Sequence, residues 1–315
     1  MPVPPVAFGC SASGLSFAGF EREGDGLVLT EHRAWELEET TFQHGLLGGP
    51  PREPEELQER VVELVRELGT PVQEASLVLP DAWLRTAFTE VANLPKDSKG
   101  RNEVLRWKLK RLVPFRVDEL RVRGAEVAPL ADQKEPHRLL LGFGIEGLFG
   151  QLERCFARAG VRIGRIANEG LSAFGALAPE VRTGDEGSLT GLTLASERGY
   201  TLVVSRGDEP VLHRFKTFPD ALPETAREST VVRDLRLTRT FLAESFPGEP
   251  LRRMVLAAPE SSEPSWVGWL ETALEQPVEP LGDQHTVPVR LGPGVDAPPR
   301  HELLPLVGAV CQEVD

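Results

Sequence analysis

The stretch that decides the fold is LTLASERGYTLVVSRGDEPVLHRFKTF, residues 192–218. Its apolar and polar residues alternate with the period of two that is typical of β-strands. The segments SERG at 196–199 and RGDE at 206–209 interrupt this alternation with residues that favour tight turns. The pattern predicts three short strands joined by two turns, which is a β-meander.

The same succession of strands and turns opens the chain, at residues 7–37. Its first turn, SASG at 11–14, shares the form Ser-x-x-Gly with the turn at 196–199, and REGDG at 22–26 is its second turn. A helix is predicted after each meander, at 54–68 and at 227–246, and each helix is followed by a buried strand. The repetition indicates a duplicated fold with two lobes.

Composition limits the functional classes. The 315 residues are 40% hydrophobic and 26% charged, which is typical of a globular protein with a sizeable core. The net charge of −13 argues against nucleic-acid binding. The sequence contains no run of about 18 apolar residues and does not start like a signal peptide. Three distant cysteines, Cys10, Cys155 and Cys311, predict buried free thiols, and six scattered histidines predict no metal site.

Between the two meanders the pattern changes. Strand-like and helical segments from residue 81 to 165 predict a β-α-β-β-α-β insertion, in which 101–113 is a helix. We therefore expect an α/β chain with three parts. The first lobe covers 1–80 and is completed by 166–180, the insertion covers 81–165, and the second lobe covers 188–315.

Several stretches resemble the actin-like pilus assembly protein PilM and the cytoplasmic domain of the secretion protein GspL, which are relatives of FtsA. The stretches are LVLPDAWLRTAF with NLP, EVLRWKLKRLVPF, LLLGFGIEGLFGQLERCFARAGVRIGRIANEGLSAFGAL and RRMVLAAPE. The resemblance implies a duplicated actin-like, or ribonuclease H-like, two-lobe fold with a small inserted α+β domain, called 1C. It also implies a cytoplasmic protein that is peripheral at the inner membrane.

The nucleotide features of that family are altered in this chain. In members, the backbone N–H groups of a loop in each meander cradle the phosphates, and an acidic residue in each loop helps to hold Mg²⁺. The two acidic positions correspond here to Gly9 and Leu194. The Gly-Gly pair that contacts adenosine corresponds to Ala257 and Ala258. We therefore expect no catalytic residues and no enzyme activity. The candidates for a degenerate ATP site are its remaining small residues: Gly9, Ser11, Ser13, Gly14, Ser196 and Gly199.

The resemblance further implies a scaffold that binds the N-terminal peptide of a PilN-like bitopic membrane protein and that cooperates with an assembly ATPase. The candidate groove residues are Trp83, Leu84, Phe88, Leu171 and Phe174. Two alternatives stay open at this point. One is an active actin-like ATPase with atypical loops, and the other is a GspL-like subunit whose membrane helix lies in a longer gene product.

The segment from Lys96 to Arg123 contains ten basic and four acidic residues, against the acidic balance of the whole chain. This asymmetry is compatible with an ordinary solvated face. It is also the pattern of a surface that contacts an anionic membrane or an acidic partner. Within the segment, Trp107 and Phe115 are predicted to pack inside the insertion, and the alternative is that they line a groove.

Overall fold

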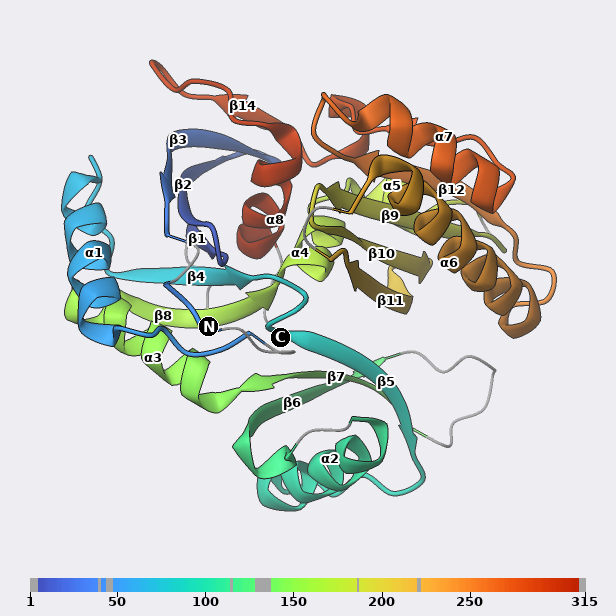
Figure 1. The fold of residues 1–315 in the computed structure, drawn as a ribbon, viewed down its shortest axis with the longest axis horizontal. Helices are drawn as coiled ribbons and strands as arrows, with labels where there is room; N and C mark the ends of the chain where they lie inside the picture. Colours follow the sequence, from blue (N-terminus) through green and yellow to red (C-terminus); the bar gives the residue numbers. More distant parts are fainter. Residues whose placement is uncertain are drawn as a thin grey trace.

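The computed structural model describes residues 5–38, 41–43, 48–113, 116–127, 137–185, 187–219 and 222–311. It consists of two lobes side by side and a smaller inserted unit that lies below both in Figure 1. Both predicted meanders are present, each with its strands and turns in the expected places.

The first lobe is built on a six-stranded sheet with the spatial order β14-β3-β2-β1-β4-β8. The meander strands pair antiparallel, whereas β4, β8 and β14 join the sheet in parallel pairings. Its strands are β1 (Val6–Cys10), β2 (Gly14–Glu23), β3 (Gly26–Glu36), β4 (Glu74–Leu79), β8 (Arg162–Asn168) and β14 (Val289–Leu291). Helices α1 (Pro54–Glu67) and α3 (Glu146–Arg158) pack side by side on this sheet, at the left of Figure 1.

Both helices of the first lobe follow from apolar periodicity. Helix α1 begins at a proline that suits a first turn, and α3 buries an apolar face that includes Leu148, Leu152 and Cys155. Cys10 and Cys155 are buried free thiols as predicted, and Cys311, the third free thiol, is only partly buried.

The second lobe repeats this plan with a five-stranded sheet in the order β11-β10-β9-β12-β13. Its strands are β9 (Leu189–Ser196), β10 (Gly199–Arg206), β11 (Glu209–Thr217), β12 (Leu251–Ala257) and β13 (Glu279–Pro280). Helices α6 (Glu224–Ser245) and α7 (Glu263–Leu274) cover one face, and a short helix, α5 (Pro179–Thr183), precedes the lobe. None of the helices in the described ranges is long and apolar enough to cross a membrane.

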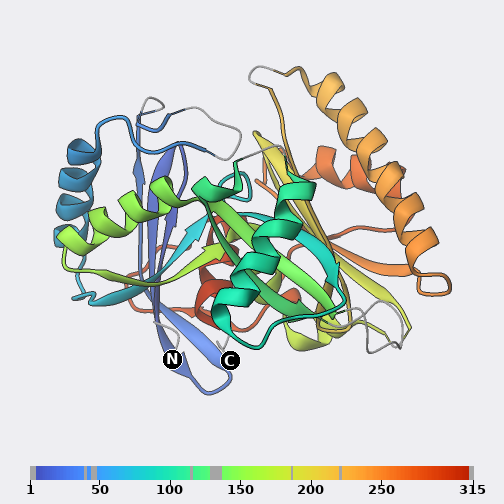
Figure 2. The same cartoon turned by 90° about the horizontal axis from the view of Figure 1, so that it is seen from below.

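The inserted unit is a three-stranded antiparallel sheet covered by one helix. Its spatial order is β5-β7-β6, and α2 packs against β6 through Leu105 and Leu109. Its elements are β5 (Arg85–Val91), α2 (Ser98–Leu112), the 3₁₀ turn η1 (Val117–Glu119), β6 (Leu120–Val127) and β7 (His137–Ile145). Figure 2, which views the molecule from below, shows α2 as the outermost layer of this unit.

Three boundaries drawn from the sequence are wrong. The insertion ends near Ile145 and not at 165, because α3 packs on α1 and β8 extends the first sheet. The second lobe does not continue to 315, because β14 and the last helix, α8 (Arg300–Cys311), return to the first lobe. Residues 81–84 form a turn, so the strand expected there starts only at Arg85.

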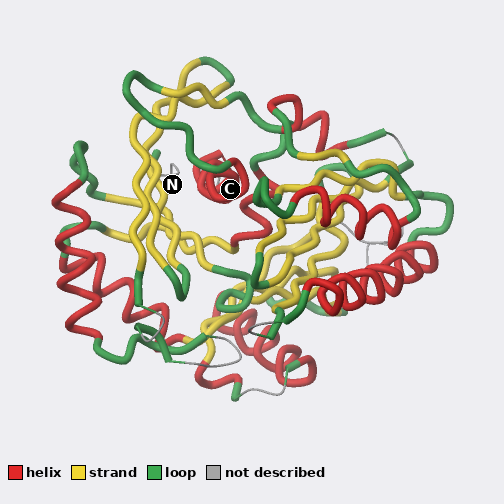
Figure 3. Tube along the Cα trace, turned by 45° about the horizontal axis from the view of Figure 1, so that its top comes forward, coloured by secondary structure: helices red, strands yellow, loops and turns green. Residues whose placement is uncertain are grey.

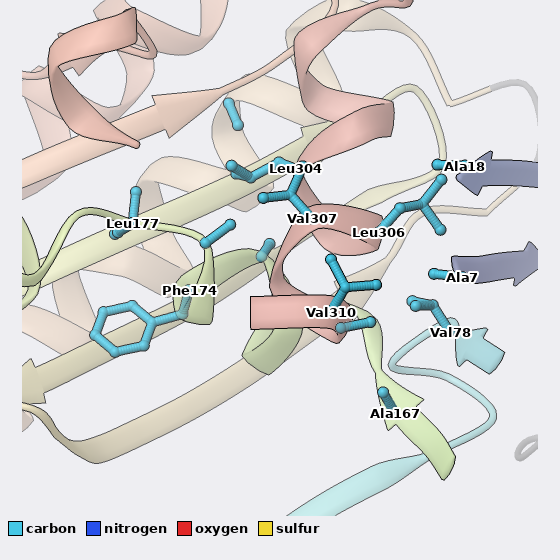
Figure 4. Close-up of a cluster of buried hydrophobic side chains, with 14 of the residues drawn as sticks. Ala7, Ala18, Val78, Ala167, Phe174, Leu177, Leu304, Leu306, Val307 and Val310 are labelled. Carbon is cyan, nitrogen blue, oxygen red and sulfur yellow. The ribbon is translucent and has the colours of Figure 1, made fainter. Parts of the chain in front are cut away.

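The two lobes share a core around two crossing helices, α4 (Glu169–Gly175) and α8. In Figure 3 the strands form two groups, with α8 between them beside the label of the C-terminus. Figure 4 shows Val307 and Val310 of α8 among side chains of the first lobe. The same buried cluster includes Leu192, Val203 and Val255 of the second lobe. Gly308 makes the crossing possible, since a Cβ atom there would lie only 1.6 Å from the carbonyl oxygen of Ser172 on α4.

Candidate functional site at the junction of the lobes

Asp81 lies at the point where the two lobes and the insertion meet. It follows β4 and Pro80, in the turn that leads into the insertion. Its Oδ1 lies 2.8 Å from Nε2 of His213 on β11, and Nδ1 of His213 lies 2.7 Å from Oγ1 of Thr86 on β5. One chain of hydrogen bonds therefore connects all three parts of the molecule.

The carboxylate of Asp81 is buried and accepts several further hydrogen bonds. Thr201 on β10 donates to Oδ2 at 2.7 Å, and the backbone N–H of Gly170 at the start of α4 donates to Oδ1 at 3.4 Å. Burial opposes ionisation of Asp81. The nearby charge of His213 and the hydrogen bonds from His213, Thr201 and Asn168 nevertheless hold the pKa of Asp81 below its ordinary value.

Glu169, the first residue of α4, has the opposite behaviour. Desolvation, reinforced by the charge of Asp81, raises the pKa of Glu169 to about 8. The two carboxyl groups at this junction therefore have pKa values shifted in opposite directions. Asp81 is ionised and hydrogen-bonded, whereas Glu169 keeps its proton near neutral pH. Such a split is the usual result when two like charges cannot both be accommodated.

The insertion has further contacts with the second lobe beside this network. Arg138 on β7 donates to the carbonyl oxygen of Val211 at 3.0 Å, and its guanidinium lies 4.4 Å from the ring centre of Phe88. Arg85 stacks in the same way over Phe215 of β11 at 5.0 Å. β11 is therefore the strand of the second lobe against which the insertion packs.

The order Thr86–His213–Asp81 resembles a hydroxyl–imidazole–carboxylate relay, but its setting argues for a structural role. The side chains of His213 and Asp81 are 1% and 4% exposed, so a substrate in solvent has no access to the imidazole. A relay needs an open position next to the nucleophile. Within the described ranges, no cluster of three or more His, Cys, Asp or Glu side chains could hold a metal ion.

The two Ser-x-x-Gly turns have the same hydrogen bonds. Ser11 Oγ donates to the carbonyl of Gly14 and accepts from the N–H of Ser13, and Ser196 Oγ does the same with Gly199 and the N–H of Arg198. Both turns are therefore closed by their own serine.

Both turn glycines are explained by packing within the meander. A Cβ atom would lie 2.7 Å from the carbonyl oxygen of Trp35 at Gly14, and 2.0 Å from that of Lys216 at Gly199. In each case the carbonyl belongs to the third strand of the same meander, so these glycines allow close approach of the backbones. The structure thus accounts for them without a ligand.

The positions expected to have lost their acids face the interior. A Cβ atom at Gly9 would lie 2.5 Å from Ser16 Oγ and 3.4 Å from Leu306 on α8. Leu194 packs against the apolar cluster shared by the lobes, and Ala257 and Ala258 are buried. A side chain at Gly9 would require the Ser16 hydroxyl to turn away.

The five candidate groove residues do not form one exposed surface. Trp83 is buried in the first-lobe core, where it packs against Phe42, and Phe174 is buried in the cluster around α8. Leu84, Phe88 and Leu171 keep partial exposure. Asn168 connects Leu84 and Leu171, because its amide donates to the carbonyl of Leu84 at 2.6 Å and accepts from the N–H of Leu171 at 2.8 Å.

Two open hollows lie elsewhere on the surface. One, of about 500 Å³, is bordered by the end of β3 and by α1, and most of its charged residues are glutamates, among them Glu36, Glu56 and Glu63. The other, of about 530 Å³, runs along α6 and includes Arg233, Arg236 and the exposed Leu237. Neither is lined by the candidate groove residues.

The sequence analysis missed the network around Asp81. Asp81 and His213 are 132 positions apart, and His213 looked like an ordinary strand residue. The available signal was an acid directly after a buried strand and its terminating proline, since the carboxyl end of a parallel strand is where functional side chains gather.

Comparison with known proteins places this architecture among actin-like folds. No protein-family model matches the chain, and neither does any curated protein sequence. A chain of a PilM–PilN type IV pilus biogenesis complex is similar in structure, with a TM-score of 0.73 and 17% identity, over 99% of this chain and 97% of that one. A Bacteroides thetaiotaomicron protein with an actin-like ATPase fold and unknown function gives a TM-score of 0.51 and 10% identity, over 88% and 90% of the two chains.

The cytoplasmic domain of EpsL, an inner-membrane component of the type II secretion system of Vibrio cholerae, gives a TM-score of 0.50 and 9% identity, over 98% and 96% of the two chains. The fold is therefore the actin-like ATPase fold, as the resemblance to PilM and GspL predicted. At these identities the likeness establishes the fold alone.

Proposed function

We propose that this protein is a non-catalytic actin-like scaffold of a type IV pilus or type II secretion assembly platform. It works in the cytoplasm at the inner membrane, where it captures the N-terminal peptide of a PilN-like bitopic protein and serves an assembly ATPase. The observation that carries the proposal is the structural likeness to a chain of the PilM–PilN complex over almost the entire length of both chains.

The geometry of the meanders supports the non-catalytic part of the proposal. Each Ser-x-x-Gly turn is closed by its own serine, and the two positions at which the resemblance expects acidic residues are Gly9 and Leu194. The network around Asp81 ties the lobes directly to each other and to the insertion. A nucleotide-driven cleft needs lobes that can separate, so these contacts favour a rigid platform.

The boundary between the first lobe and the insertion is the place where we expect the peptide to bind. Leu84 is partly exposed there, and β5 is an edge strand of its sheet. Phe88, also partly exposed, lies on β5 beside Arg138, which contacts β11 of the second lobe. An edge strand offers free backbone groups to an extended peptide, and adjacent apolar side chains provide specificity. The buried Trp83 and Phe174 support this surface from within and do not belong to it.

Calorimetric titration tests the proposal. The ligands are Mg-ATP and, separately, the N-terminal peptide of a PilN-like bitopic membrane protein from the same organism. We expect micromolar binding of the peptide and no heat from ATP. Phe88→Ala should weaken the peptide by about tenfold or more, whereas the same change at the exposed Phe241 on α6 should not.

Either of two results would contradict the proposal. Tight binding of Mg-ATP, with hydrolysis, would establish the alternative of an active actin-like ATPase with atypical loops. If the changes at Phe88 and Phe241 have equal effects on peptide affinity, the peptide does not bind at the boundary of the insertion.

A further inference from the structure

Helix α2 has an unusual charge for this acidic protein. Its 15 residues include six basic side chains and a single acidic one, Glu103. The basic residues are Lys99, Arg101, Arg106, Lys108, Lys110 and Arg111. Leu105 and Leu109 face β6, which leaves Lys99, Lys110 and Arg111 exposed.

The structure separates these residues from the other basic residues of the segment. Arg116 pairs with Glu119, and Arg121 is bound by Glu146 and Glu153 of α3. No basic side chain of α2 forms an ion pair with an acidic residue within the described ranges. Six of the ten basic residues in 96–123 therefore lie on one helix, where Lys99, Arg101, Lys110 and Arg111 are exposed.

An exposed tryptophan lies at the centre of this charge. Trp107 is 52% exposed and Leu112 is 50% exposed, so the prediction that Trp107 packs inside the insertion is wrong. Phe115 lies outside the described residues. The guanidinium of Arg111 lies 4.5 Å from the Trp107 ring centre, and the ammonium of Lys108 lies 5.5 Å from it.

This combination has a known physical use. Tryptophan partitions to the boundary between lipid headgroups and acyl chains, because its ring is apolar and its N–H is polar. Lysine and arginine beside it keep their charge at the level of the phosphates while their stems lie along apolar surface. Figure 2 shows that α2 forms the outer layer of the insertion, so a flat surface could approach it.

We propose that the outer face of α2, formed by Trp107, Lys110 and Arg111 with Lys108 and Leu112 at its sides, docks on an anionic lipid surface. The protein is thereby held at the membrane with the insertion towards the lipid. The proposal rests on the proposed function only for the identity of that membrane. Charge complementarity argues for lipid, because the face is basic in a chain of net charge −13 and combines that charge with an exposed Trp.

Co-sedimentation with vesicles tests the docking. The full chain is mixed with vesicles of phosphatidylcholine alone, or with about 30% phosphatidylglycerol, at about 0.1 M and about 0.5 M salt. We expect binding only to the anionic vesicles and only at low salt. Lys108→Glu combined with Arg111→Glu should reduce the bound fraction roughly tenfold or more.

A matched control comes from α6. Arg233 and Arg236 are exposed, three residues apart on a helix like Lys108 and Arg111, and remote from the insertion. Changing both to Glu alters the net charge by the same amount and should leave vesicle binding intact. Trp107 also gives an optical readout: its emission should move to the blue on anionic vesicles, and Trp107→Phe should remove that shift.

Three outcomes would overturn the docking proposal. They are equal binding to neutral and anionic vesicles, no binding at all, and an equal loss in the α6 control. Binding of poly-glutamate without binding of anionic vesicles would also reject lipid and assign the face to an acidic protein. Titration of the partner peptide onto the Lys108/Arg111 variant separates the two proposals, because peptide binding should survive there.

Discussion

The insertion has two surfaces that differ in whether their charged side chains are paired or exposed. Its inner surface, against the lobes, has buried and paired groups: Arg138 with the Val211 carbonyl, and Thr86 with His213 and Asp81. Its outer surface, on α2, has basic residues that solvent reaches and that no carboxylate pairs with within the described ranges. A count of charged residues along the sequence therefore does not separate two kinds of residue. Some stabilise the fold through buried contacts, and others remain available to a partner.

The largest effect is expected from the inner surface. Asp81→Ala removes the acceptor for His213, Thr201 and Gly170 and leaves their donors buried. Leaving a buried donor without its acceptor costs about 1–3 kcal/mol of unfolding free energy for each group. Urea denaturation should measure that loss for Asp81→Ala and a smaller one for the double variant with His213→Ala. A loss below about 1 kcal/mol would mean that the junction does not depend on this network.

The two carboxyls of the junction also predict a pH dependence. The folded state raises the pKa of Glu169 to about 8, so it retains a proton that the unfolded chain has already lost. Stability therefore falls as pH rises from the ordinary glutamate value towards 8. In Glu169→Gln, the free energy of unfolding should lose about 2 kcal/mol less over this pH range than in the unchanged protein. This effect is smaller than that of Asp81→Ala, because Glu169 keeps part of its surface exposed.

Asp81 provides the contrast for that experiment. Its folded pKa is lowered, so the stability it contributes is present at neutral pH and is lost only as the pH falls through that lowered pKa. Asp81→Asn should remove the loss of stability at acid pH. It should also reduce the loss of stability towards pH 8, because the negative charge of Asp81 helps to raise the pKa of Glu169. Unfolding curves at several pH values separate the two residues, and identical pH profiles for both variants would refute the assignment.

A smaller effect is expected where the insertion meets the first lobe. Arg121 on β6 donates two hydrogen bonds to each of Glu146 and Glu153 on α3. The hydrogen bonds that Arg121 donates to those carboxylates, partly opposed by desolvation, raise its pKa above the ordinary value. Arg121→Met should cost about 1 kcal/mol, since charge-assisted bonds of this type exceed exposed pairs.

Arg116 is the control for that measurement. Its ion pair within the described part of the chain is with Glu119, and its side chain is 80% exposed. Arg116→Met should therefore leave the free energy of unfolding unchanged within about 0.5 kcal/mol. If both variants behave alike, the inner and outer basic residues of the segment do not differ in the way proposed.

The sequence predicted the elements better than their assembly. Both meanders followed from alternation and turn residues, because these signals are local. Strand β14 could not be predicted, since Val289–Leu291 is only three residues long and is defined by its pairing with β3. The boundary of the insertion failed for the same reason: the partners of α3 and β8 are α1 and β4, which precede the insertion in the chain.

The junction shows the same limit for functional residues. The small residues of the two turns were correctly located, and packing against the third strands explains why Gly14 and Gly199 are glycines. The contact of Asp81 with His213 depends on how two lobes meet, and no spacing in the sequence encodes it. Exposure of Trp107 likewise depends on which side of α2 the sheet covers.

The smallest effect completes the comparison. Lys108→Gln combined with Arg111→Gln removes two charges from the outer face and breaks no ion pair described for α2. The free energy of unfolding should therefore change by less than about 0.5 kcal/mol, as for other exposed sites. Thermal unfolding measures this change. Removing two neighbouring positive charges also removes their mutual repulsion, so we expect no strong destabilisation. A large loss would mean that the basic residues stabilise the insertion, and the outer face would then resemble the inner one.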